Sequence, residues 1–95
     1  MEVRKEIRKE IVDFFEDEFF EDDFCFLDGL DDAIAGAVCV DGVPLVVYGI
    51  NAIIKILMHR DGMDREEAWK YFFHNIRCAH FGEKTPLFME QFPID

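Results

Sequence analysis

Residues 33–48 read AIAGAVCVDGVPLVVY, and this stretch decides the fold. Two runs of small and β-branched residues, 33–40 and 43–48, flank Asp41-Gly42. A type I′ turn needs positive φ at both central positions, so Asp-Gly between such runs predicts a two-residue β-hairpin. Pro44 cannot donate to a ladder, so we expect the second strand to lie at an edge there or to start after it. Small residues in the first strand predict that another element packs closely over it: Ala33, Ala35, Gly36 and Ala37.

After the hairpin, apolar residues at helical spacing predict a helix over residues 50–61, with Gly49 as N-cap and Gly62 as the C′ residue. Asp64 and Glu67 then form a capping box, which predicts a further helix to about His80. Gly82 ends that helix, and Thr85–Met89 predicts a short third strand in which Pro86 marks an edge. The residues expected in the core include Ile53, Leu57, Phe72 and Ile76.

Ahead of the hairpin, apolar residues from Val3 to Phe15 predict an amphipathic helix over about residues 2–19. The expected fold is a single α+β domain over 1–95: an N-terminal helix (1–20), an acidic loop (21–32) and an α+β core (33–89). We expect a small antiparallel sheet with three helices in the order α-β-β-α-α-(β). The last two helices are expected to form a hairpin over one face of the sheet.

The formal net charge is −11, and its distribution is uneven. Residues 13–32 contain ten acids, six of the eleven Phe, and no Lys or Arg; we call them the acidic segment. This balance argues against direct binding of nucleic acid, whose phosphates need Lys and Arg, and against an anionic membrane surface. The partners expected are therefore cations, the basic surfaces of other proteins, or none at all.

The residues we predict to bind a partner all lie in the acidic segment: Asp13, Glu16, Asp17, Glu18, Glu21, Asp22, Asp23, Asp28, Asp31, Asp32, Phe20 and Phe24. Duplex DNA carries about one charge per 1.7 Å of axis, and ten carboxylates along a helix and the following loop would approach that density. The segment would then occupy the basic groove of a nucleic-acid-binding protein. The alternative is a solvated surface that only keeps a Phe-rich chain soluble. No stretch matches a calcium-binding loop.

No catalytic, cofactor or metal site is expected. His74, Cys78 and His80, with His59 on the preceding helix, have only part of the spacing of a zinc site. The chain has no Ser, and nothing resembles a third group that would orient a Cys–His pair. We therefore expect that the protein is not an enzyme. Three Cys without a CxxC pair and a charged N-terminus predict a reduced, cytoplasmic protein.

The helix from Asp64 is aromatic over more than half its circumference, with Trp69, Tyr71, Phe72 and Phe73 nearly consecutive. Such a helix is either central in the fold or shared with a second surface, in a homodimer or with a partner. The first hypothesis for function is a module that binds a basic protein surface. The alternative is a structural or self-assembling homo-oligomer, in which the acidity serves solubility.

Three motifs in the second half of the chain resemble a family of small, mostly uncharacterised bacteriophage and bacterial proteins. They are the turn Asp61-Gly62-Met63, the helix from Glu66 to Ile76 (EEA-x-x-YF-x-x-NI) and the segment from Gly82 to Pro86 (GE-x-TP). The resemblance covers about residues 30–89 and departs from the family at Gly49, where similar sequences tend to have Asp. It implies no enzymatic role. It implies a phage-like context, in which small acidic proteins inhibit host or defence proteins by binding them.

Overall fold

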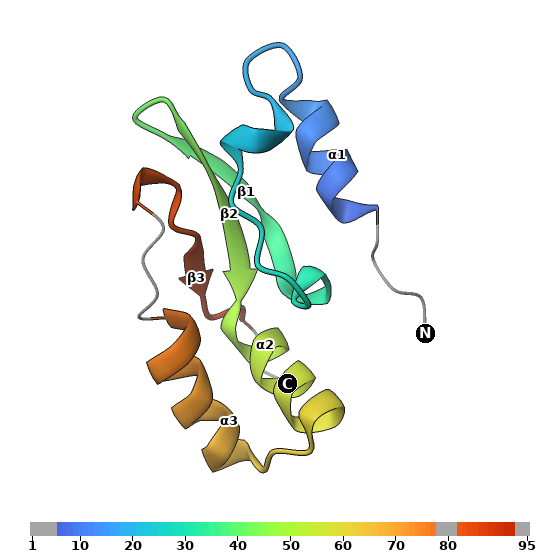
Figure 1. Ribbon diagram of the computed structural model, residues 1–95, viewed down its shortest axis with the longest axis vertical. Coiled ribbons are helices and arrows are strands. Elements are labelled where there is room, and N and C mark those ends of the chain that lie inside the picture. The colour runs from blue at the N-terminus through green and yellow to red at the C-terminus, as the bar shows by residue number, and fades with distance from the viewer. Residues whose placement is uncertain (1–5, 78–81, 93–95) are drawn as a thin grey trace.

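The computed structural model describes residues 6–77 and 82–92, and it has the predicted α+β class and element order (Figure 1). The main elements are α1 (Ile7–Phe14), β1 (Ile34–Val40), β2 (Val43–Gly49), α2 (Ile50–Asp61), α3 (Arg65–Tyr71) and β3 (Leu87–Met89). Short helical turns join them: η1 (Glu21–Asp23), η2 (Asp31–Ala33), η3 (Phe72–Arg77, π-helical) and η4 (Gly82–Lys84).

The hairpin forms as predicted. β1 and β2 pair antiparallel, with Val40 opposite Val43 and a bulge between Ile34 and Gly36. Asp41 and Gly42 have φ angles of 51° and 81°, the left-handed values that a type I′ turn requires. β3 pairs only with residues 47–49 of β2, so the Pro44 end of β2 lies at an edge on that side.

The third strand corrects the predicted sheet type. β3 pairs parallel with β2, in the register Val47–Leu87, Tyr48–Phe88 and Gly49–Met89, so the three-stranded sheet is mixed rather than antiparallel. Parallel neighbours need a crossover of a dozen or more residues, which the two helices and the following turn supply here. A strand of three residues carries no local signal of its direction.

The helical pair α2–α3 has the predicted boundaries at three of its four ends. α2 runs from Gly49, as N-cap, to Gly62, whose φ of 71° ends it in the left-handed conformation. α3 begins with the capping box: the Glu67 amide donates to Asp64 Oδ1 at 2.8 Å and the Asp64 amide donates to Glu67 Oε1 at 3.1 Å. Its α-helical turns end at Tyr71, the π-helical turn follows, and the predicted end at His80 lies outside the described residues.

The position of this pair differs from the prediction. α2 and α3 lie beyond the end of the sheet at which β2 runs into α2, and not over a sheet face (Figure 1). The Phe72 side chain, directly after α3, connects this pair to the sheet: its ring contacts that of Phe88 in β3, with 5.4 Å between the centroids. Ile53, Leu57 and Phe72 are fully buried, as predicted, whereas Ile76 is only partly buried at the margin of the core.

The first helix is shorter than predicted. α1 ends at Phe14 instead of near residue 19, and the predicted residues 2–5 lie outside the described part of the chain. Carboxylates at the C-terminus of a helix oppose its macrodipole, and Glu16, Asp17 and Glu18 would have occupied the last turn. α1 packs over β1 beside Ala37, as the small residues predicted, whereas Ala35 is exposed and a Cβ built on Gly36 would have no neighbour within 4 Å.

We expect Leu57→Ala to lower the free energy of unfolding by about 2–5 kcal/mol, because it opens a cavity among fully buried side chains. Urea unfolding followed by circular dichroism measures this loss. Lys55→Ala, at an exposed position of the same helix, is the control and should change stability by no more than about 0.5 kcal/mol. Equal effects of the two substitutions would contradict the assigned inner face of α2.

Candidate functional site

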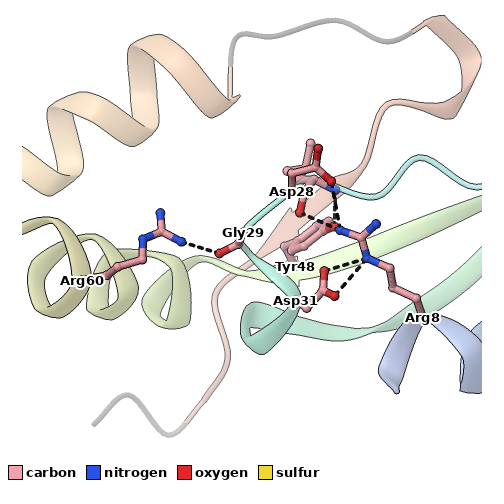
Figure 2. A network of polar contacts seen from close by, with 7 residues as sticks. Arg8, Asp28, Gly29, Asp31, Tyr48 and Arg60 are labelled. Atoms are coloured by element: carbon pink, nitrogen blue, oxygen red, sulfur yellow. Dashed lines mark hydrogen bonds and ion pairs between the residues drawn. The ribbon is translucent and has the colours of Figure 1, made fainter. Parts of the chain in front are cut away.

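The acidic segment is fixed to the centre of the sheet by one buried hydroxyl. The backbone amide of Leu27 donates to Oη of Tyr48 at 2.7 Å (Figure 2). Tyr48 is fully buried in the middle strand, and its burial raises its pKa to about 12, although the hydrogen bond from Leu27 partly opposes this rise. The phenol therefore stays neutral and serves as a fixed acceptor over the ordinary pH range.

Four of the Phe in the segment form a cluster on that anchor. Phe15, Phe19, Phe24 and Phe26 lie in successive ring contacts, with centroids 5.9–6.2 Å apart. Aromatic pairs at this separation add to the stability that burial already gives. Phe24 is only 6% exposed and belongs to the core. We therefore remove Phe24 from the predicted partner-binding surface, because a side chain already covered by its own chain cannot meet a partner.

Arg8 of α1 holds two of the predicted partner-binding acids. Its Nε donates to both carboxylate oxygens of Asp31, at 2.9 and 3.0 Å, and its Nη2 lies 3.3 Å from Oδ1 of Asp28 (Figure 2). The guanidinium also lies 5.0 Å from the centre of the Phe26 ring. Burial lowers the pKa of Arg8, but the hydrogen bonds and charges of Asp31 and Asp28 outweigh it, so the pKa is raised. Asp28 and Asp31 thus join α1 to the segment.

Sequence reasoning missed Arg8. It lies 20 and 23 residues before the acids that it contacts, and nothing in the neighbouring sequence distinguishes it from Lys5 or Lys9. Only the way in which the segment folds back over the sheet brings these side chains together.

Three more of the predicted acids make interactions within the chain. Asp23 Oδ2 accepts the backbone amide of Phe20 at 2.8 Å, which caps the turn η1. Asp13 lies 3.4 Å from Lys9 on the exposed side of α1, where such a pair contributes little. Asp32 is half-buried in η2 and makes an interaction of its own. Asp23 thus shapes the segment, whereas Asp13 stays at the surface.

The remaining acids gather in what we call the acidic tip: Phe14, Glu16, Asp17, Glu18, Phe20, Glu21 and Asp22. All seven are exposed, and Phe14 and Phe20 are 81% and 79% exposed. The five carboxylates form no ion pair with any described cation. The loop that follows α1 projects at the end of the molecule opposite α2 and α3 (Figure 1). The tip therefore combines exposed negative charge, unpaired within residues 6–77 and 82–92, with two open aromatic rings.

The structure also corrects the comparison with a phosphate track. That comparison assumed a helix reaching residue 19, with carboxylates along some 25 Å of axis. Because α1 ends at Phe14, the acids of the tip lie instead in a compact turn and in η1. Lys84 Nζ donates to the backbone carbonyl of Asp22 at 2.6 Å, which ties the end of the tip to η4.

The aromatic residues of α3 and η3 are partly buried in the core and partly exposed. Ala68 and Phe72 are buried, whereas Tyr71 and Phe73 are exposed, and the Arg77 guanidinium covers the Phe73 ring at 4.9 Å. Beside it lies a hollow of about 330 Å³ between η3, α2 and the loop at residues 26–30. Arg60 spans from α2 to that loop, where its Nη1 donates to the Gly29 carbonyl at 2.6 Å (Figure 2). Its guanidinium is therefore engaged within the fold.

Within residues 6–77 and 82–92, no group of three or more His, Cys, Asp or Glu side chains is placed to hold a metal ion. His59 and His74 are exposed on their helices, and Cys78 and His80 lie outside the described residues. Over the same ranges, no helix combines the length and the apolar character needed to cross a membrane.

None of the protein-family models, curated proteins and solved structures compared with the chain matches it. The resemblance to small phage proteins and the expectation that the chain is not an enzyme therefore stay predictions.

We expect Tyr48→Phe to lower the free energy of unfolding by about 1–3 kcal/mol at neutral pH, because the Leu27 amide loses its acceptor. We also expect the wild type to lose stability as the pH rises from about 10, where an unfolded Tyr ionises, to about 12, where the folded one does. The folded chain keeps a proton that the unfolded chain releases over this range. Tyr48→Phe should lack this component of the alkaline loss.

Urea unfolding at several pH values between about 8 and about 12 measures both effects, and absorbance at about 295 nm follows the ionisation of the phenol. Tyr71→Phe removes the hydroxyl of the exposed tyrosine and should keep the wild-type pH dependence. The same alkaline loss in Tyr48→Phe and in the wild type would contradict the role of the buried phenol.

Proposed function

We propose that the chain is a protein-binding module whose acidic tip docks on a basic, nucleic-acid-binding surface of another protein. The observation that carries this proposal is the pair of open rings, Phe14 and Phe20, among five carboxylates that have no ion-pair partner in the described chain. An isolated aromatic ring in water gains from burial at an interface, and aromatic residues often carry much of the binding energy there.

The nature of the partner follows from the charges. The five tip carboxylates would attract a surface with excess Lys and Arg, and this attraction increases the rate of association and excludes acidic partners. Proteins that bind nucleic acid carry such surfaces, because they must neutralise phosphates. On this proposal the chain competes with nucleic acid for the groove of its partner and acts as an inhibitor, in keeping with the phage-like context that the resemblance implies.

A surface that served solubility alone would need the charges but not the rings. Four of the six Phe of the acidic segment pack into the cluster on the sheet, so the fold can cover aromatic side chains at this position. Phe14 and Phe20 remain outside, although Phe14 touches Phe15 edge to face at 5.0 Å. Exposed large apolar groups reduce solubility, which makes them costly unless they bind something.

To test the charge, we would replace four tip acids that cap nothing: Asp17→Asn, Glu18→Gln, Glu21→Gln and Asp22→Asn. The matched control removes four exposed acids elsewhere: Asp41→Asn, Glu66→Gln, Glu83→Gln and Glu90→Gln. Both variants change the net charge equally. The immobilised chains are incubated with bacterial lysate. The bound proteins are then eluted in steps of NaCl, or, in a parallel experiment, displaced with duplex DNA.

We expect the wild type and the control to retain basic nucleic-acid-binding proteins that duplex DNA displaces, and the tip variant to lose them. Binding should weaken by on the order of tenfold when salt rises from about 0.05 to 0.2 M, because exposed charges are screened. Equal capture by the two variants would show that the acidity has no specific target and would overturn the proposal.

The rings are tested separately. Phe14→Ala with Phe20→Ala should reduce affinity for the captured protein by on the order of 30-fold or more, as at other interface hot spots. Stability should change by less than about 1 kcal/mol, because both side chains are largely exposed. Isothermal titration and thermal melting measure the two effects. Unchanged affinity would restrict the contact to the carboxylates.

A further inference from the structure

The sheet has one face that the described chain leaves uncovered; we call it the outer face. Paired residues share a face, and Val46, Tyr48 and Phe88 point to the core. The alternate positions therefore form the outer face, and they are Gly36, Val38 and Val40 in β1, Val43, Leu45 and Val47 in β2, and Leu87 and Met89 in β3. None of these positions carries a polar or charged side chain.

Exposure shows that this face is open along its two edge strands. Val38, Val40, Leu87 and Met89 are between 40% and 45% exposed. A Cβ built on Gly36 would have no neighbour within 4 Å. Leu45 and Val47 are 8% exposed in the central strand, where β1 and the segment from η4 to β3 flank them. When one face of a sheet is solvated, polar residues on that face normally alternate along each strand with apolar residues on the core face. An outer face with only apolar side chains therefore predicts a second layer of structure over it.

The distribution of charge indicates what kind of partner covers the outer face. The acidic segment packs on the inner side of the sheet through Phe24 and Leu30, and its tip projects at the end of the molecule opposite α2 and α3 (Figure 1). The outer-face positions carry no carboxylate that could attract a basic partner. A second copy would meet the outer face with an equal, uncharged face and keep both acidic segments on the far sides.

The distances show that the net charge permits this arrangement. Stacked layers lie about 10 Å apart, so two inner layers separated by two sheets would lie about 30 Å from each other. The Debye length is about 8 Å at 0.15 M salt and about 30 Å at 0.01 M. Repulsion between the acidic segments is therefore screened at physiological salt and acts at low salt.

The size of the face sets the strength of the contact. A seven-residue strand is about 23 Å long, and three strands span about 14 Å, which is small for a stable interface. We expect a reversible dimer with a dissociation constant in the micromolar range, and not an obligate one.

We propose that two copies of the chain pack through their outer faces into a two-sheet sandwich with twofold symmetry. This proposal is independent of the acidic tip, which lies at another part of the surface. It predicts that self-association strengthens as salt rises, whereas binding through the tip weakens.

Sedimentation velocity of the full chain with a reducing agent, from about 1 to 300 µM protein and about 0.02 to 0.5 M NaCl, tests the proposal. Val38→Lys places a charge on the outer face, and Cys39→Lys places the same charge one residue further, at an exposed position on the other face. Lys makes the chain less negative, so a loss of association cannot come from added repulsion. Leu87→Lys repeats the test from the other edge strand, and circular dichroism checks folding.

At about 0.5 M salt, where repulsion is screened, we expect the wild type, Cys39→Lys and the four-acid tip variant to dimerise alike, and Val38→Lys and Leu87→Lys to weaken the dimer at least tenfold. A wild type that is monomeric at every concentration and salt would overturn the proposal. Equal association of Val38→Lys and Cys39→Lys would also overturn it. A third outcome is a wild type that stays monomeric and captures a lysate protein that the Val38→Lys variant does not capture. The outer face would then bind a different protein, and the proposed self-association would be wrong.

Discussion

The hydrogen bond from the Leu27 amide to the Tyr48 hydroxyl is the contact on which the arrangement of the whole N-terminal third depends. It fixes a segment without regular secondary structure to the centre of the sheet. Phe24 and Leu30 then reach the core, and Arg8 can reach Asp28 and Asp31 from α1. The sheet itself has only three strands, so this segment supplies most of its inner layer.

The parts of the fold that were predicted correctly depend on local chemistry. The positive φ at Asp41 and Gly42, the left-handed Gly62 and the Asp64–Glu67 capping box are each specified by a few neighbouring residues. The parts that were not predicted depend on contacts distant in the sequence. The direction of β3 depends on the path of the chain through two helices, and the burial of Phe24 depends on a cluster with Phe15 and Phe19.

The candidate site shows the same division. Sequence reasoning located the acidic segment but gave its acids one common role. The structure separates acids that hold the fold, such as Asp23 and Asp31, from those whose carboxylates form no ion pair among the described residues, such as Asp17 and Asp22. No local pattern could make this separation, because the partner of Asp31 lies 23 residues away. The exposed Phe14 and the buried Phe24 likewise differ only in what the fold places beside them.

The parallel pairing of β3 with β2 has a consequence for how the chain acquires its structure. The hairpin and the helical pair consist of neighbouring segments and can form early, but Phe88 meets Tyr48 and Phe72 only after the chain has crossed back from α3. Closing such a long loop costs entropy before its contacts form, which makes parallel pairing slow. The step that completes the core is therefore expected to limit the rate of folding, and until it occurs β2 keeps an unpaired edge at which nascent chains can associate wrongly.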